Sequence, residues 1–238
     1  MHTIAVIPLR AGSKGLPGKN IRPLAGKQLF LHSIDHARLA GIKKVLISTD
    51  ILELLDLDLG PDVHVAPRPS ELAVDEIPME QVLSHVLSQD ISGPATIVLL
   101  QATSPLRDPS DIRRAIDLHA AERYDLVMSV TRANSSVLKW GHVEGQDFLP
   151  LSDPAFCFFN RDQLPQVYRP DGAIYVFDAD FFRGVGALGR GRIGVIETPA
   201  ERAHDIDTLA DFDAVAAIMD RLSASNTLIS VTDSLIRS

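Results

Sequence analysis

Short apolar runs rich in β-branched residues recur along the chain, separated by polar segments with helical periodicity. The runs predict buried strands at residues 4–7, 45–48, 63–65, 96–100 and 126–130. The segments between them predict helices at residues 29–40, 51–57 and 76–88, with a further helix opened by residues 108–111. Strand and helix therefore alternate as in βαβ units, which predicts an α/β fold around a mainly parallel, doubly wound sheet.

Two helix starts carry capping signals. Asp108 is the expected N-cap of one helix, with Pro109 in its first turn. Thr208 and Asp211 have the spacing of a capping box and predict a helix from about residue 209 to residue 222. The remaining residues 223–238 form a Ser/Thr-rich tail that we expect to be loosely ordered.

The alternation breaks between residues 132 and 171, where apolar and aromatic residues stand in a polar background. This segment fits either an insertion that covers the core or a dimerisation arm, and its aromatic residues favour the arm. Strands resume at residues 173–177 and 193–196. We therefore expect residues 1–238 to form a single domain with one inserted arm at residues 132–171.

The composition narrows the classes of function. A formal net charge of −8 argues against a general nucleic-acid-binding protein. The single cysteine, Cys157, rules out an internal disulfide and suits a reducing compartment. No apolar run approaches the ~18 residues of a membrane span, and the apolar start lacks the basic segment of a signal peptide. We expect a cytoplasmic enzyme without nucleic-acid or membrane partners.

Residues 10–20, which follow the first predicted strand, hold three glycines and three cations in an otherwise acidic chain. Glycines let backbone N–H groups approach a ligand closely, and Arg10, Lys14 and Lys19 add positive charge there. Such a loop after the first strand of an α/β chain favours phosphate binding, with a solvated surface turn as the alternative. The spacing matches neither the Walker A loop nor the G-x-G-x-x-G fingerprint.

Asp205 and Asp207 form the second chemical feature. In extended chain just ahead of a helix, residues two apart point to the same face. Two carboxylates on one face suit a Mg²⁺ ion that shares its coordination with phosphate oxygens, although acids at a helix start give the same pattern. Together with the cationic loop, the pair indicates an enzyme that binds a nucleoside triphosphate and Mg²⁺. Because no nucleophile is assignable, direct attack by a second substrate is simpler than a covalent intermediate.

Six motifs follow one another from the first strand to the last helix. They are R-x-x-S-K-G-x-P-x-K-N from residue 10, S-T-D from 48, R-P-x-E-L-A from 68, L-Q-x-T-S-P-L-R from 100, Q-L-P-Q-x-x-R-P-x-G-A-I-Y from 163 and D-I-D-T from 205. In this order they resemble the acylneuraminate cytidylyltransferases, the CMP-sialic acid synthetases. The resemblance implies a three-layer α/β/α fold of the nucleotide-diphospho-sugar transferase type. The implied reaction is Mg²⁺-dependent: the anomeric hydroxyl of a nine-carbon 2-keto sugar acid attacks the α-phosphorus of CTP, giving CMP-sugar and pyrophosphate.

The same resemblance implies roles for individual residues. The implied CTP contacts are Arg10, Ser13, Lys14, Lys19, Asn20 and Arg68. The implied sugar-acid contacts are Gln101, Ser104 and Tyr175, with Lys139 and Arg161 of the arm. In the family the arm forms a homodimer with shared active sites, so that arm residues enter the partner's site. Asp205 and Asp207 are the implied Mg²⁺ ligands, and Arg10 and Lys19 join them as catalytic residues.

Two departures from the family pattern leave the identity of the sugar acid undecided. The family usually has Asn in R-P-N-G-A-I-Y where this chain has Asp171, and its paired phenylalanines are absent from residues 186–189. N-acetylneuraminate, legionaminate, pseudaminate and deaminated acids therefore all stay candidates. The alternatives are a cytidylyltransferase for another sugar acid, such as 3-deoxy-octulosonate, and a catalytically silent nucleotide-binding module.

Overall fold

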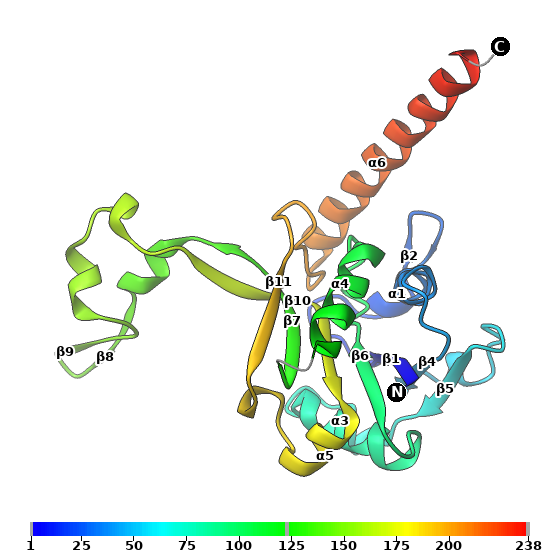
Figure 1. The fold of residues 1–238 in the computed structure, drawn as a ribbon, viewed down its shortest axis with the longest axis horizontal. Coiled ribbons are helices and arrows are strands. Elements are labelled where there is room, and N and C mark those ends of the chain that lie inside the picture. The colour runs from blue at the N-terminus through cyan, green and yellow to red at the C-terminus, as the bar shows by residue number, and fades with distance from the viewer. Residues whose placement is uncertain (1, 122–123, 237–238) are drawn as a thin grey trace.

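A seven-stranded sheet forms the centre of the computed structural model, which describes residues 2–121 and 124–236, the backbone alone from residue 225. Its strands are β1 (His2–Leu9), β4 (Val45–Thr49), β5 (Val63–Pro67), β6 (Ala95–Leu99), β7 (Leu126–Ala133), β10 (Val167–Asp178) and β11 (Ile193–Glu197). They lie in the order β11-β7-β10-β6-β1-β4-β5 (Figure 1). All neighbours are parallel except β10, which runs antiparallel to β6 and β7. The predicted sheet is therefore confirmed as mainly parallel, with one antiparallel strand.

Helices cover both faces of this sheet. They are α1 (Leu29–Leu39), α2 (Leu52–Leu55), α3 (Met79–Gln89), α4 (Pro109–Ala120), α5 (Ala179–Val185) and α6 (Leu209–Ile236). Alternate residues of β1 enter different cores, as expected of a strand buried on both sides. Ile7 packs in a cluster with Phe30 of α1 and Ile112 of α4, whereas Val6 packs with Leu83 of α3. The molecule thus has three layers, with α1, α2 and α4 on one face and α3 and α5 on the other.

Local signals place the helix boundaries well. Gly41 follows the end of α1 with a φ of 85°, and Asp108 caps α4 by accepting from the backbone N–H of Ser110 at 2.8 Å. The pattern predicts neither α5 nor the hairpin of β2 (Pro23–Leu24) and β3 (Lys27–Gln28). Each of these elements has too few residues for its periodicity to stand out.

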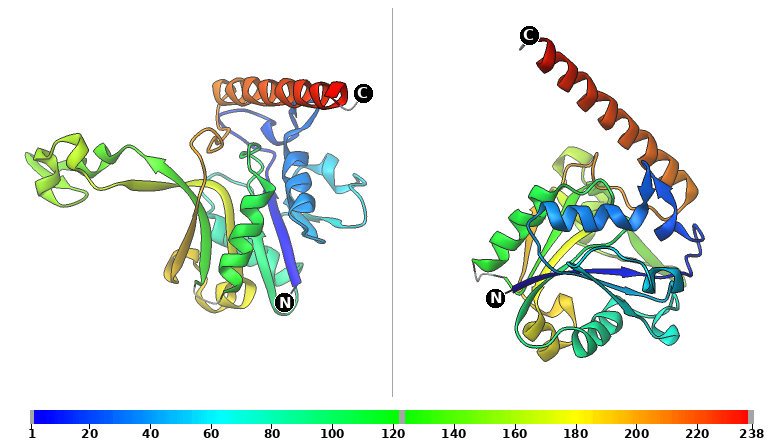
Figure 2. Two further views of the ribbon diagram at one scale, coloured as in Figure 1. Left: turned by 45° about the horizontal axis from the view of Figure 1, so that its top comes forward. Right: turned by 90° about the vertical axis from the view of Figure 1, so that its right-hand side faces the viewer.

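The segment predicted as an arm leaves the sheet as a continuation of β7 and β10. Both of its ends are therefore strand rather than irregular chain, with Val167 paired to Ala133 and a register shift after Pro170. Beyond them the segment carries the hairpin β8 (Gly141–Glu144) and β9 (Asp147–Pro150), and Figures 1 and 2 show it projecting from the body. Large apolar side chains are exposed on it: Trp140, Val143, Phe148, Leu151 and Phe158.

The last helix begins at the predicted capping box. The backbone N–H of Thr208 donates to Oδ2 of Asp211 at 2.8 Å, and the N–H of Asp211 donates back to the Thr208 hydroxyl at 3.3 Å. From there α6 extends away from the body (Figure 2). Of the tail at residues 223–238, the backbone is helical to Ile236, and residues 237–238 lie outside the described part. Within the described residues no helix, α6 included, is both long enough and apolar enough to cross a membrane.

Candidate active site

The glycine loop leaves β1 and is anchored at both of its ends. The side-chain amide of Asn20, which is 5% exposed, donates to the carbonyl oxygen of Arg10 at 3.0 Å. The backbone N–H of Ala11 donates to Oδ1 of Asp50 at 2.8 Å, which joins the loop to the end of β4. Its last residues form a short 3-10 turn at Lys19–Ile21. These contacts tie the two ends of the loop to each other and to the end of β4.

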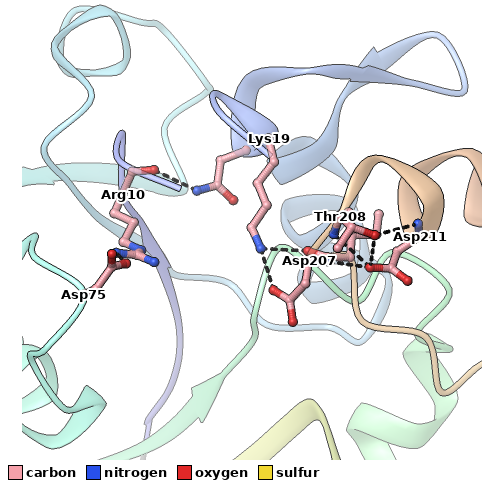
Figure 3. A network of polar contacts seen from close by, with 8 residues as sticks. Arg10, Lys19, Asp75, Asp207, Thr208 and Asp211 are labelled. Atoms are coloured by element: carbon pink, nitrogen blue, oxygen red, sulfur yellow. Dashed lines mark hydrogen bonds and ion pairs between the residues drawn. The ribbon is translucent and has the colours of Figure 1, made fainter. Parts of the chain in front are cut away.

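Lys19 connects this loop to the acidic segment (Figure 3). Its Nζ donates to the carbonyl oxygen of Ile206 at 2.7 Å and to Oδ1 of Asp207, 188 residues away in sequence, at 2.9 Å. Gly15 permits the close approach, because a Cβ built there would lie 2.3 Å from the carbonyl oxygen of Asp207. No residue with a side chain fits at position 15 unless one of the two segments moves.

The residue between the two aspartates anchors them. Ile206 is fully buried in the cluster beneath the start of α6, and its N–H donates to the carbonyl oxygen of Thr103 at 2.9 Å. Because Ile206 enters the core, its neighbours Asp205 and Asp207 are both left facing one cavity. The two carboxylates therefore line the same cavity, as their spacing in the sequence predicts.

That cavity has a volume of about 170 Å³ and lies where β1 and β6 end, the edge of α/β sheets at which ligands bind. Its wall combines residues from four separately predicted segments: Arg10, Lys19, Asn20, Arg68, Gln101, Asp205 and Asp207. A second cavity of about 370 Å³ adjoins it at Arg10 and is lined by Ser13 and Lys14. Together the two cavities reach the size range of small-molecule sites.

The two aspartates differ in their surroundings. Burial raises the pKa of Asp205, the Asp207 carboxylate raises it further, and a hydrogen bond from the Thr103 hydroxyl opposes both effects. Both residues are exposed at the cavity mouth, and Asp207 is paired with Lys19. In the part of the chain that the structure describes, no group of three or more His, Cys, Asp or Glu side chains gathers to hold a metal by itself. The donor set thus fits Mg²⁺, which commonly takes one or two carboxylates and completes its shell with phosphate oxygens and water.

Arg68 is a buried cation in the wall of the cavity. Its Nη2 donates to the carbonyl oxygen of Ser48 at 2.7 Å. The backbone N–H of Arg68 donates to the carbonyl oxygen of Thr49, also at 2.7 Å. Burial lowers its pKa to about 10, so the side chain still carries its charge at neutral pH. The end of β4 therefore presents a fixed positive charge to the site.

Arg107, the last residue of the L-Q-x-T-S-P-L-R motif, holds the backbone of Gln101 in place. The guanidinium of Arg107 donates to the carbonyl oxygens of Gln101 at 2.6 Å and Ala173 at 2.7 Å. Ser104 in the same loop is 1% exposed, so its predicted contact with the sugar acid stays a prediction. Tyr175 is half-buried, and its pKa is raised by burial and then by the carboxylates of Asp171 and Asp205.

Asp171, the departure from the family motif, is a buried carboxylate. Its side chain accepts from the hydroxyl of Ser129 and, at 3.0 Å, from the backbone N–H of Ala173. The following residue, Gly172, has a φ of 79° and faces the side chain of Gln101. The turn that carries the changed residue is thus adjacent to the predicted sugar-acid side of the site.

Lys139 and Arg161 lie on the projecting arm and not in the cavity of their own chain. The ammonium group of Lys139 donates to the carbonyl oxygen of Phe159, within the arm, and Arg161 is exposed. Within one chain these two residues therefore do not join the other predicted site residues. Their contribution to a site stays a prediction that requires a second chain.

Asp75 is a site residue that the motifs do not reveal. Its carboxylate pairs with the guanidinium of Arg10 and, at 2.7 Å, with the ammonium of Lys14 (Figure 3 shows the Arg10 contact). These hydrogen bonds, that from Lys14 first, lower the pKa of Asp75. Two cations predicted to bind phosphate are thus bound to a carboxylate from the 70–78 segment. Asp75 stands two residues after the R-P-x-E-L-A motif, but no local rule pairs it with residues 10 and 14.

Replacement of Asp75 by Asn should strengthen the binding of CTP by about two- to fivefold, the range of a partly exposed ion pair. The reason is that a phosphate must compete with the Asp75 carboxylate for Arg10 and Lys14. The measurement is titration calorimetry with CTP alone. Glu71→Gln makes the same charge change in the same segment and should leave the affinity unchanged. Weaker binding by the Asp75 variant would show that this carboxylate holds Arg10 in place instead.

Comparison with known proteins bears on this geometry. The family model described as cytidylyltransferase matches residues 4–149. The N-acylneuraminate cytidylyltransferase of Streptococcus agalactiae serotype III is 32% identical over 223 residues, which cover 89% of this chain and 52% of that protein. The CMP-N,N'-diacetyllegionaminic acid synthase of Legionella pneumophila is 38% identical over 125 residues, which cover 50% of this chain and 53% of that protein. The chain thus spans about half the length of the streptococcal relative, whereas the match to the Legionella protein covers about half of each chain.

Among solved structures, the fold is similar to that of CMP:2-keto-3-deoxy-manno-octonic acid synthetase in complex with CTP. The TM-score is 0.67 at 18% sequence identity, over 93% of this chain and 99% of that one. At this identity the likeness establishes a shared fold.

Proposed function

Since the chain belongs to the cytidylyltransferase family, we propose that it transfers the CMP group of CTP to a nine-carbon 2-keto sugar acid and releases pyrophosphate. The anomeric hydroxyl of the acid attacks the α-phosphorus directly. One observation carries this proposal: a single cavity brings the cationic loop, Arg68, Gln101 and both aspartates together. Each of these groups comes from a different strand end or loop, so their convergence is a property of the fold.

The residues divide the work by charge. Arg10 and Lys19 neutralise phosphate oxygens and favour departure of pyrophosphate, whose negative charge grows as the bond to the α-phosphorus breaks. Arg68 adds a buried positive charge at the end of β4. Asp205 and Asp207 would hold Mg²⁺, which supplies Lewis-acid stabilisation of the developing phosphate charge. Binding both substrates in one place supplies the remaining gain, because the attack becomes effectively intramolecular.

The substrate class follows from the relatives and from the turn at Asp171. The relatives named above are an N-acylneuraminate cytidylyltransferase and a CMP-N,N'-diacetyllegionaminic acid synthase. A buried carboxylate at position 171, beside Gly172 and Gln101, changes the charge near the predicted sugar. We therefore propose a nonulosonic acid as substrate, with N-acetylneuraminate, legionaminate, pseudaminate and deaminated forms as the candidates to compare.

The experiment is pyrophosphate release with each nucleoside triphosphate against a panel of these acids, with and without Mg²⁺. We expect turnover with CTP and at least one nine-carbon acid, and none after the ion is chelated. Turnover only with 3-deoxy-octulosonate would replace the proposed acid while keeping the reaction. No turnover with any acid, together with CTP binding, would indicate a silent nucleotide-binding module and refute the proposal.

We also propose that the arm joins two copies into a homodimer, with Lys139 and Arg161 reaching the site of the other copy. The exposed apolar side chains of the arm supply the contact area, and Trp140 is 59% exposed. Trp140→Glu should therefore convert dimers to monomers in sedimentation velocity, because burying an unpaired carboxylate at an interface is costly. Leu52→Glu, on an exposed residue of α2, is the matched control. A dimer that persists in the Trp140 variant would place the interface elsewhere.

A further inference from the structure

Arg202 makes two ion pairs just ahead of the acidic segment. Its Nη1 lies 2.7 Å from Oδ2 of Asp108, and its Nη2 lies 2.8 Å from Oδ2 of Asp111. Both carboxylates belong to the first turn of α4, where Asp108 is the N-cap. The side chain of Asp111 is only 3% exposed, so one of the two pairs is screened from water. One guanidinium thus spans two carboxylates that the helix start holds in fixed positions.

The two segments that Arg202 joins are the ones that carry the reactive oxygens. Residues 101–107, which include Gln101 and Thr103, lead directly into the α4 turn that Arg202 contacts. Three residues after Arg202 comes Asp205, and the backbone N–H of the next residue, Ile206, donates to the carbonyl oxygen of Thr103 at 2.9 Å. The guanidinium therefore connects the two walls of the cavity at a point outside it.

Other contacts along this stretch are local or weak. The N–H of Arg202 donates to the carbonyl oxygen of Pro199 at 3.0 Å, and that of Ala203 donates to Ala200 at 3.2 Å, which forms a tight turn. Arg169 reaches the carbonyl oxygen of Ala203 at a long 3.4 Å. Among the described residues, the two ion pairs of the Arg202 side chain are the shortest contacts that join this turn to another element.

We propose that Arg202 is a positioning residue for the carboxylates of Asp205 and Asp207. It does not line the cavity, and acts by fixing the 203–207 segment against the 101–107 loop. This role rests on the proposed function, in which both aspartates hold Mg²⁺. Partners that orient metal ligands from outside commonly change metal affinity or activity by about 10- to 100-fold when removed.

The chain offers a close control for a test. Arg114 pairs with the same buried carboxylate, at 2.6 Å to Oδ1 of Asp111, but it lies on α4 itself and has no link to the acidic segment. Arg202→Met removes the charge and keeps an unbranched apolar stem, and Arg114→Met does the same on the helix. Arg202→Lys keeps the charge but lacks the planar fork that reaches two carboxylates at once.

The first measurement is hydrogen exchange of the backbone amides of residues 203–208 in the full chain, which requires no activity. We expect about tenfold faster exchange in Arg202→Met, an intermediate rate in Arg202→Lys, and the parent rate in Arg114→Met. The second is the Mg²⁺ concentration for half-maximal turnover. It should rise about tenfold in Arg202→Met, with a KM for CTP within about twofold of the parent.

Several outcomes would overturn the proposal. Unchanged exchange in Arg202→Met would do so, and equal effects of Arg202→Met and Arg114→Met would show a role in α4 stability alone. If Arg202→Met raised the KM for CTP as much as the Mg²⁺ concentration for half-maximal turnover, the substitution would disturb the whole site and not the aspartates in particular. If the parent protein turns over no acid, the proposed function fails, while the exchange measurement still tests the position of Arg202.

Discussion

Asp207→Asn should lower turnover by about 100- to 1,000-fold while CTP still binds, because a carboxylate that acts on developing charge contributes mainly in the transition state. The Asn side chain keeps an oxygen for the ammonium of Lys19, which the structure places 2.9 Å from Oδ1 of Asp207. The fold around the segment should therefore persist, since Ile206 provides the buried anchor. The measurement is kcat by pyrophosphate release, with the Kd for CTP by calorimetry.

The control for this variant is Asp213→Asn. Asp213 is exposed on α6, six residues after Asp207, and does not line the cavity. The variant makes the same charge change, so it should retain the parent kcat. An unchanged kcat in Asp207→Asn would remove this residue from the proposed metal site, and an equal loss in the control would point to net charge as the cause.

Lys19→Ala should cost about 2–4 kcal/mol of transition-state stabilisation, a loss of roughly 30- to 1,000-fold in kcat/KM. Its side chain is 12% exposed, and its ammonium group joins the loop to the acidic segment through the carbonyl oxygen of Ile206 and the carboxylate of Asp207. Removing it takes away a positive charge at the phosphates and also loosens this junction. Both effects act on the same bond-breaking step.

Two other lysines calibrate the Lys19 result. Lys27→Ala removes an ion pair with Asp35, outside the cavity, and should leave kcat/KM unchanged. Lys14→Ala removes a cation whose side chain is 79% exposed, and should cost less than Lys19→Ala because water screens its charge. An unchanged kcat/KM in Lys19→Ala would show that this lysine does not contribute to the reaction. A loss in Lys14→Ala as large as that in Lys19→Ala would contradict the ranking by burial.

Most of the sheet could be predicted from the sequence, because most of its strands are recognisable from a short local run of residues. β1, β4 and β6 are continuous apolar runs, a pattern that requires burial on both faces and hence helices on both sides. The position of β10 could not be predicted in this way. Its residues pair with β6 and β7 in antiparallel direction, and direction leaves no trace in an apolar run.

The site shows the same division between local and long-range information. Residue type and spacing identify the cationic loop, the acidic pair and the capping box, because each is complete within about a dozen residues. No such rule predicts the contact of Gly15 with the backbone of Asp207, or the pairing of Asp75 with Arg10. Those contacts depend on how far apart the strand ends lie in the folded sheet.

Local sequence thus specified which chemical groups this protein has and on which elements they stand. Tertiary structure decided which of them meet: Lys19 with Asp207, Asp75 with Arg10 and Lys14, and Arg202 with the start of α4. It also separated Lys139 and Arg161 from the cavity of their own chain. The physical reason is that propensity, capping and periodicity act over a few residues, whereas these contacts depend on the order and packing of strands distant in sequence.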